Sequence, residues 1–195
     1  MLEPSADILR RRLREAPSPR LVEMPGMRQA GVLLPLLPHP EGWRLILIRR
    51  SSSLARHQGQ IAFPGGVRDP QDPDLLATAL RESREEVGLD PARVEVLGAL
   101  DQVWTPTGFI LSPFVGLLPC PCRLQAHPGE VEEILEAPVD RLADPAVFRS
   151  EVWERGGRTY DVVFFEMGAY TVWGATGRIL ARFLEVAWGW SRPQG

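Results

Sequence analysis

The chain has 195 residues, of which 44% are hydrophobic, and a domain of this size buries roughly 70% of the surface that its unfolded chain exposes. Its net charge of -3 and its pI near 5.7 supply no basic field, so we expect no nucleic-acid partner. All 22 basic residues are arginine, and the sequence contains neither lysine nor asparagine. This composition excludes a Walker-type phosphate loop, a Schiff-base lysine and a papain-like Cys-His-Asn centre.

The N-terminal part of the chain predicts one helix and a connector. Residues 5–15 have the pattern of a short helix with Ser5 as a candidate cap, and the proline-containing residues 17–25 are typical of a connector. We therefore expect an N-terminal helix and connector over residues 1–25 and a single domain over residues 26–195.

A β-hairpin is predicted next. Residues 30–37 and 43–50 are rich in aliphatic side chains, and they flank the turn sequence His39-Pro40-Glu41-Gly42.

A helix is predicted over residues 74–87. Aspartate caps free N–H groups and proline is tolerated in the first turn, so Asp72-Pro73-Asp74 is a helix start, while Gly88 is a stop. The side chains expected on its buried side fall at helical spacing and are Leu76, Leu80, Ser83 and Val87, with Ala79 at the margin of that side.

The rest of the chain alternates predicted strands and helices. Strands are predicted over residues 94–103, 110–118, 130–136 and 159–165, a helical excursion over 139–148, and a closing amphipathic helix over 176–188. This order predicts a mixed α/β fold in which strands distant in sequence pair with one another.

The cysteines and histidines give no metal or disulfide pattern. Cys120 and Cys122 are too close for an ordinary disulfide, and we interpret them as small residues in a turn rather than a redox pair. The three histidines lack the spacing of zinc ligands.

Apolar runs stay well short of the ~18 residues of a membrane span, and the first thirty residues lack the apolar core of a signal peptide. We therefore expect a cytoplasmic protein without a membrane partner.

Three glutamates of the 74–87 helix form the clearest chemical feature. Glu82 and Glu86 are one turn apart, Glu85 lies beside them, and we expect all three to avoid the buried side. Like charges at this spacing cost roughly a few tenths of a kcal/mol each, which a cation would offset. Magnesium suits such a site because it prefers oxygen ligands and takes one or two carboxylates plus waters and substrate phosphates. Arg81 can pair with Glu85; the alternative is a solvated acidic helix face.

A glycine loop precedes this helix. Pro64, Gly65 and Gly66 end the apolar stretch Ile61–Phe63, and the absence of side chains lets the backbone approach a ligand closely. A glycine carbonyl can then reach a metal held by the helix. Such a metal would bridge pyrophosphate oxygens, orient a water and neutralise charge developing on phosphorus. The pattern therefore predicts hydrolysis of a phosphoanhydride.

The segment from Gly65 to Leu89 resembles the signature of the Nudix hydrolases, G-x5-E-x7-R-E-U-x-E-E-x-G-U, where U is usually apolar. The second half matches through Arg81-Glu82-Ser83-x-Glu85-Glu86-x-Gly88-Leu89, with Ser83 at the position of U. Counting back from Arg81 places Pro73 and Val67 at the signature glutamate and glycine. In this resemblance Asp72 or Asp74 has to replace the glutamate.

A second motif lies directly upstream: Ile46-Leu47-Ile48-Arg49-Arg50-Ser51, then Arg56-x2-Gly59-x3-Phe63-Pro64-Gly65-Gly66. It resembles the extra motif of the coenzyme A pyrophosphatase subgroup of the Nudix hydrolases, as Trp173-Gly174-Ala175-Thr176 also does. The resemblance implies an α/β fold, namely a Nudix-type α/β/α sandwich with a mixed β-sheet. It also implies that Mg²⁺ or Mn²⁺ supports cleavage of a small-molecule substrate, coenzyme A, to 3',5'-ADP and 4'-phosphopantetheine.

The candidate site residues follow from this resemblance and from side-chain chemistry. Coenzyme A carries a diphosphate and a separate 3'-phosphate, which arginine forks bind well. Arg49 and Arg50 point to opposite faces if the strand continues through them, so only one faces the ligand without a twist. The substrate-binding candidates are Arg49, Arg50, Arg56, His57, Gly65 and Gly66; the metal candidates are Glu82, Glu86 and Glu85; and the catalytic candidates are Glu85 and Glu130.

Two alternatives remain at this stage. One is a Nudix hydrolase of ADP-ribose or another nucleoside diphosphate derivative. The other is a nucleotide-sensing domain that binds without cleavage, although a pure sensor does not require a triad of metal-binding glutamates. The sequence leaves the oligomeric state open.

Overall fold

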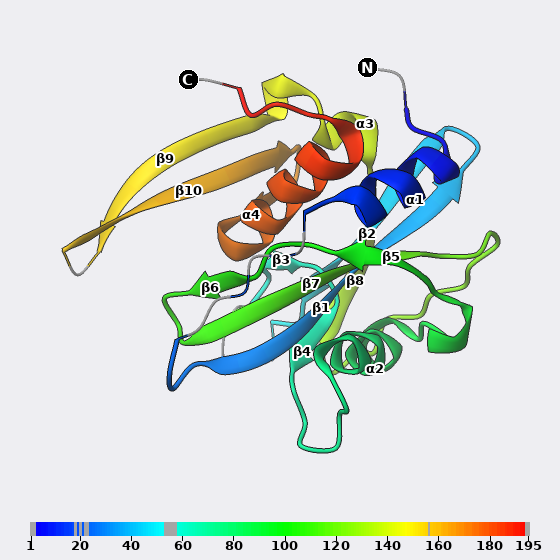
Figure 1. The fold of residues 1–195 in the computed structure, drawn as a ribbon, viewed down its shortest axis with the longest axis horizontal. Helices are drawn as coiled ribbons and strands as arrows, with labels where there is room; N and C mark the ends of the chain where they lie inside the picture. The colour runs from blue at the N-terminus through cyan, green and yellow to red at the C-terminus, as the bar shows by residue number, and fades with distance from the viewer. Residues whose placement is uncertain are drawn as a thin grey trace.

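The computed structural model describes residues 3–193 except for residues 18, 20, 22–23, 53–57 and 156. Its centre is an eight-stranded mixed sheet (Figure 1). The strands are β1 (Arg28–His39), β2 (Gly42–Arg50), β3 (Ile61–Ala62), β4 (Gly65–Val67), β5 (Glu95–Ala99), β6 (Val103–Thr105), β7 (Phe109–Leu117) and β8 (Val131–Pro138).

The central pairing follows from the predicted hairpin. β1 and β2 are antiparallel and pair from Leu36 and Leu45 to the turn at His39 and Gly42. Beyond Leu36 the two strands separate, and the segment between them pairs with both, because β3 pairs with β2 and β4 pairs with β1. The glycine loop therefore lies in an opening of the sheet. β7 runs parallel to β1 along nine residue pairs, which makes the sheet mixed.

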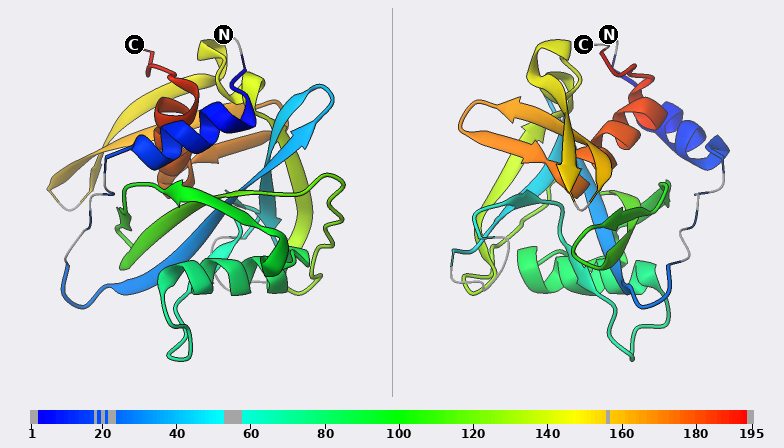
Figure 2. Two further views of the ribbon diagram at one scale, coloured as in Figure 1. Left: turned by 45° about the vertical axis from the view of Figure 1, so that its right-hand side comes forward. Right: turned by 90° about the vertical axis from the view of Figure 1, so that its left-hand side faces the viewer.

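A second, three-stranded sheet consists of β9 (Phe148–Arg155), β10 (Arg158–Met167) and β11 (Tyr170–Trp173) in the order β11-β10-β9. The sequence predicted β10 but neither of its partners. Charged and apolar residues of β9 do not alternate around Glu151 to Glu154, where Val152 and Trp153 are adjacent and all four residues are exposed, so its amphipathic pattern is weak. Its hairpin with β10 projects from the body of the molecule (Figures 1 and 2).

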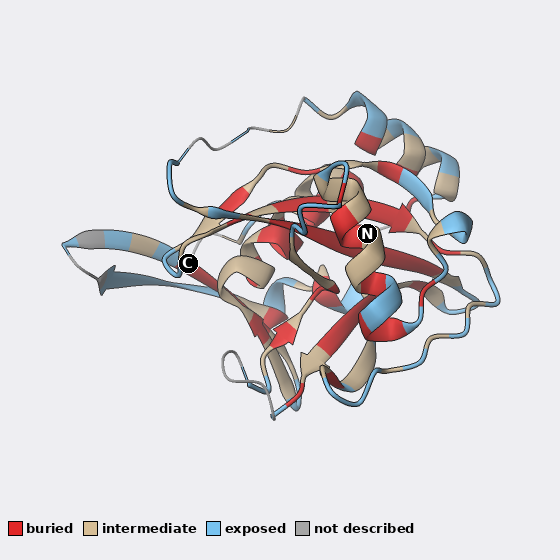
Figure 3. Cartoon of the chain, turned by 90° about the horizontal axis from the view of Figure 1, so that it is seen from below, coloured by how far each residue is buried: buried red, intermediate tan, exposed pale blue. Residues whose placement is uncertain are grey.

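The helices cover both faces of the central sheet, which confirms the predicted sandwich (Figure 2). They are α1 (Ala6–Glu15), α2 (Leu75–Val87), α3 (Val139–Leu142) and α4 (Gly174–Phe183). α2 packs on one face with Leu33, Ile46 and Ile48 of the sheet. α1, α4 and the second sheet pack on the other face, where Leu34, Leu45 and Leu47 are buried. Figure 3 shows this concentration of buried residues along the central strands.

The helix starts and stops match their sequence signals. Ser5 caps α1 by accepting from the N–H of Ile8, and Asp74 caps α2 by accepting from the N–H of Ala77. Gly88 ends α2 in the left-handed conformation at φ 68°. The closing helix differs from its predicted range of 176–188, because the α-helix ends at Phe183 and a π-helical turn, Leu184–Trp188, follows.

The buried side of α2 also differs from the prediction. Ser83 and Val87 are buried as expected, but Leu76 and Leu80 are only partly buried, and Ala79 lies at the centre of the contact. The reason is a very close approach to β1: a Cβ on Gly31 would lie 2.1 Å from the Leu75 carbonyl oxygen and 2.7 Å from the Ala79 nitrogen. Small residues therefore face the sheet, and the larger leucines lie at the margin.

No helix within the described residues is long and apolar enough to cross a membrane.

Candidate active site

Arg81 organises the exposed side of α2. Its Nε and Nη2 donate to the two carboxylate oxygens of Asp72, each at 3.0 Å. Its guanidinium also lies 2.9 Å from Glu82 and 2.9 Å from Glu85. The predicted pairing of Arg81 with Glu85 is thus present, and Arg81 additionally joins the helix to the segment before it.

Asp72, rather than Asp74, lies where the resemblance requires a replacement for the signature glutamate. Its side chain is buried and accepts from Arg81, from the Thr78 hydroxyl at 2.9 Å and from the Asp69 N–H at 3.0 Å. Arg81 holds the pKa of this carboxyl well below its usual range. Asp74 instead caps the helix, so Asp72 is the aspartate that lies against the arginine of the signature.

Glu86 contradicts the expectation that all three glutamates avoid the buried side, because it is only 2% exposed. One carboxylate oxygen accepts from the Gly65 N–H at 2.9 Å, and the other lies 3.5 Å from Nη1 of Arg50. Burial raises the pKa of Glu86 to about 7, against the opposing effects of Gly65 and Arg50. The glycine loop, the helix and the upstream arginine therefore meet at this carboxylate.

Glu82 lies against the second glycine of the loop. A Cβ on Gly66 would come within 2.4 to 2.5 Å of the Glu82 carboxylate, so the glycine makes room for it. Burial raises the pKa of Glu82 above its ordinary value, while Arg81 opposes the shift. Glu85 differs from both, since its side chain is 46% exposed.

Glu130 lies close enough to act electrostatically on the helix glutamates, and its charge contributes to the raised pKa values of Glu82 and Glu86. Two hydrogen bonds attach the preceding segment to the last turn of α2: the N–H of Gln125 donates to the Val87 carbonyl and that of His127 to the Glu86 carbonyl, both at 2.9 Å. The Ser51 N–H donates to the Glu130 carbonyl at 2.8 Å.

The side chains of Arg49 and Arg50 point to opposite faces of β2, as strand alternation requires. Arg50 lies at Glu86, whereas Arg49 forms ion pairs of 3.2 Å with Glu132 and Glu133. A register shift between Arg49 and Arg50 in the β2–β8 ladder lets these consecutive glutamates meet one arginine. The Tyr170 hydroxyl donates to Glu133 at 3.0 Å, a contact from the second sheet that the sequence analysis did not identify.

The structure brings together six of the predicted site residues: Arg50, Gly65, Gly66, Glu82, Glu86 and Glu130. Glu85 lies at the edge of this group and Arg49 lies on the other side of the strand. Arg56 and His57 fall outside the described residues.

The acidic group matches the chemistry of a divalent cation, although its carboxylates are paired with arginines. Among the described residues, no three His, Cys, Asp or Glu side chains are arranged to hold a metal ion as they stand. However, Glu82, Glu86 and Glu130 repel one another, and two of them are raised in pKa by burial. Hard oxygen donors under mutual repulsion fit Mg²⁺ or Mn²⁺.

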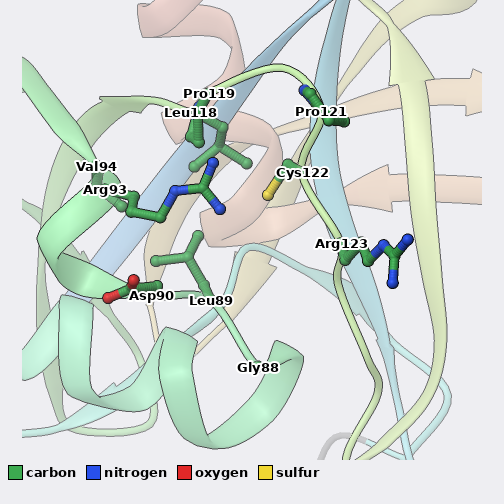
Figure 4. Close-up of a pocket in the computed structure, with 10 residues that line it drawn as sticks. All are labelled: Gly88, Leu89, Asp90, Arg93, Val94, Leu118, Pro119, Pro121, Cys122 and Arg123. Carbon is green, nitrogen blue, oxygen red and sulfur yellow. The ribbon is translucent and has the colours of Figure 1, made fainter.

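A separate pocket of about 380 Å³ lies beyond the C-terminal end of α2 (Figure 4). The Arg93 guanidinium and the Cys122 thiol point toward each other across it. Burial raises the pKa of the Cys122 thiol, and both Cys120 and Cys122 are free. None of the three α2 glutamates lines this pocket, so it is separate from the acidic group described above.

A family model described as NUDIX domain matches residues 27–162. The chain belongs to the Nudix family. A Photorhabdus laumondii protein named uncharacterized Nudix hydrolase NudL is 39% identical over 158 residues, which cover 81% of this chain and 84% of that protein. A protein of the same name from Pectobacterium atrosepticum is 38% identical over 173 residues, covering 89% and 88%.

Solved Nudix structures share the fold. The chain superposes on a MutT/nudix family protein from Enterococcus faecalis with a TM-score of 0.52 and 15% identity, covering 95% of this chain and 75% of that one. The Nudix hydrolase RenU from M. smegmatis gives a TM-score of 0.51 and 21% identity, covering 63% and 77%. These two structures show the fold alone. Membership of the Nudix family assigns the chain to a class of hydrolases that act on nucleoside diphosphate derivatives and generally use divalent metals.

Proposed function

We propose that this Nudix hydrolase cleaves the diphosphate of coenzyme A, including acylated or oxidised forms, to 3',5'-ADP and 4'-phosphopantetheine. The observation that carries the proposal is the contact of Arg50 with Glu86, 3.5 Å apart. Arg50 belongs to the upstream motif that resembles the coenzyme A subgroup, and Glu86 belongs to the Nudix signature. Their contact supports a single site built from both motifs.

Arg50 has the properties of a phosphate ligand. Its Nε is buried and has no hydrogen-bond partner within the described part of the chain. A buried donor without a partner is costly, and a phosphate oxygen of the substrate would satisfy it. Gly65 and Gly66 contribute by leaving space beside the carboxylates, so that the diphosphate can approach the backbone.

The helix glutamates are assigned to the metal. Glu82 and Glu86 would hold Mg²⁺ or Mn²⁺, with Glu85 at the margin, and the ion would neutralise charge on the diphosphate. We assign the general base to Glu130 rather than Glu85, because Glu85 is exposed and held by Arg81, whereas the charge of Glu130 acts on both Glu82 and Glu86. Glu130 would take a proton from the water that attacks phosphorus as the phosphoanhydride P–O bond breaks.

The test compares turnover of coenzyme A and ADP-ribose by the purified protein in Mg²⁺ and in Mn²⁺, with products identified by mass. We expect faster cleavage of coenzyme A and the release of 3',5'-ADP. Faster cleavage of ADP-ribose would overturn the substrate assignment. Tight nucleotide binding without turnover of either compound would show a sensing domain instead.

A further inference from the structure

Two arginines one turn apart on α4 differ in how their charges are neutralised. Arg182 donates from Nε to Asp101 at 2.9 Å and pairs with Glu185 at 3.2 Å. Arg178 donates from Nη1 to the backbone carbonyl of Trp104 at a long 3.4 Å. Within the described residues, no aspartate or glutamate lies within 4.0 Å of the Arg178 guanidinium. Arg178 therefore lacks the carboxylate partner that Arg182 has.

Arg178 is also partly buried, so its charge is poorly solvated. Burial lowers its pKa, against the attraction of Asp161. Asp161 is itself ion-paired with Arg192, whose positive charge acts on Arg178 in the same direction as burial. The opposite charges of Asp161 and Arg192 thus offset each other in part, and the half-buried guanidinium of Arg178 keeps a charge that an anionic ligand would stabilise.

An aromatic pair lies beside this arginine. The rings of Trp104 and Tyr160 have centroids 5.9 Å apart and planes inclined by 60°, and both residues are partly buried. Trp104 also provides the carbonyl that accepts from Arg178. Aromatic faces pack on a flat heterocycle while a guanidinium binds phosphate, so the three side chains suit a phosphorylated nucleoside.

Arg178 on α4 and the glutamates on α2 lie on opposite faces of the central sheet, so a ligand that reaches both has to pass over the end of the sheet at which β1 and β2 separate. The strand order β4-β1-β7-β6 puts Val67 and Val103 in one row, through Ala30 and Leu111. Three strand spacings, or roughly 14 Å, therefore separate β6 from the glycine loop. A substrate that joins a nucleoside to a second group through a diphosphate can span such a distance.

We propose that Arg178, with Trp104 and Tyr160, forms a subsite for the 3'-phosphorylated adenosine end of the substrate, in which the guanidinium binds the 3'-phosphate. This inference rests on the proposed function, since coenzyme A supplies that group. ADP-ribose has no 3'-phosphate, so the subsite makes the enzyme selective between the two diphosphates. Arg178 is thus a specificity-determining residue, distinct from the groups that act on the diphosphate.

The test measures kcat and KM for coenzyme A and for dephospho-coenzyme A, which lacks only the 3'-phosphate. We expect Arg178→Gln to lower kcat/KM for coenzyme A by about 10- to 100-fold, mainly through KM, because one charge-assisted hydrogen-bonded contact is lost. Its kcat/KM for dephospho-coenzyme A should remain that of the wild type. Arg182→Gln is the matched control, on the same helix, and should leave the preference between the two substrates unchanged.

Equal losses for both substrates, or no loss for either, would overturn the subsite. If the wild-type protein cleaves neither substrate, the proposed function fails. The role of Arg178 is then decided by calorimetry, which compares the affinities for 3',5'-ADP and for 5'-AMP, the analogue without the 3'-phosphate. The subsite requires the wild type to bind 3',5'-ADP more tightly and Arg178→Gln to lose that preference. Equal affinities in the wild type would contradict it. Circular dichroism of both variants checks that α4 is retained.

Discussion

Glu86 combines features that residue patterns alone do not reveal. The signature spacing places it beside Glu82 on one helix, and this part of the site was predicted from sequence. Its burial was not, because it depends on the segment 61–67 lying in the opening between β1 and β2. The assignment of Arg50 rather than Arg49 to this carboxylate likewise depends on which strand face meets α2, a tertiary property.

Glu86→Gln is expected to lower kcat by about 100-fold or more, because it removes an anionic ligand that would hold the metal ion whose charge offsets that of the diphosphate. The variant should remain folded, since the amide oxygen can still accept from the Gly65 N–H and the repulsion by Glu82 and Glu130 is relieved. Steady-state kinetics and urea denaturation measure the two effects. Glu136→Gln is the control, because Glu136 is an exposed residue of β8, and its activity should equal that of the wild type. Full activity of Glu86→Gln would show that Glu86 is not a metal ligand.

The Asp72–Arg81 pair predicts a stability change in acid. The folded-state pKa of Asp72 lies below the ordinary value of 3.8, so its contribution to stability is present above that pH and is lost as the pH falls through the folded-state pKa. The stability difference between wild type and Asp72→Asn should therefore be constant near neutral pH and shrink below about pH 4. Denaturant unfolding at several pH values measures it, and a difference independent of pH would contradict the pairing.

At the scale of elements, the contact of α2 with β1 positions the whole acidic group. Sequence periodicity located the helix and both of its ends, because capping and stop signals are local. It placed Ser83 and Val87 in the interface correctly but also placed Leu76 and Leu80 there, because the depth of approach is set by Gly31 on another element. The same limit explains why β9 and β11 were missed: their pairing with β10 stabilises them more than their own sequence patterns do.

Gly31→Ala should destabilise the protein by about 3 kcal/mol or more, because the added methyl would overlap the backbone of α2. Activity should fall as well, since the helix that carries Glu82 and Glu86 must shift. Gly129→Ala is a matched control: its methyl would meet only the His127 ring, at 3.4 Å, so we expect stability within about 1 kcal/mol of wild type. Thermal unfolding of both variants provides the comparison, and equal stabilities would argue against the close contact.

At the scale of the whole molecule, one face of the central sheet carries the candidate active site and the other carries most of the hydrophobic core. α2 and the site lie on one face, while the first and last helices close the larger core on the other, where Leu9 and Leu13 of α1 are buried with Phe183 of α4. Arg12 also donates to the Ala187 carbonyl at 2.7 Å, which joins the N-terminal helix to the C-terminal turn. The order of elements predicted a mixed α/β fold, and the family resemblance implied the sandwich. The attachment of residues 6–15 to the C-terminal part was not, because nothing local in the sequence encodes a contact between the two ends of the chain.

β1 pairs with β2, β4 and β7, and α2 rests on it. A strand with neighbours on every side opens only when most of the molecule opens with it, so its backbone amides should be among the slowest to exchange with deuterium. Gly65 pairs with Val32 of that strand. The proposed diphosphate-binding loop is consequently attached to the strand that we expect to open last, so differences in substrate preference between relatives should arise in the elements around it.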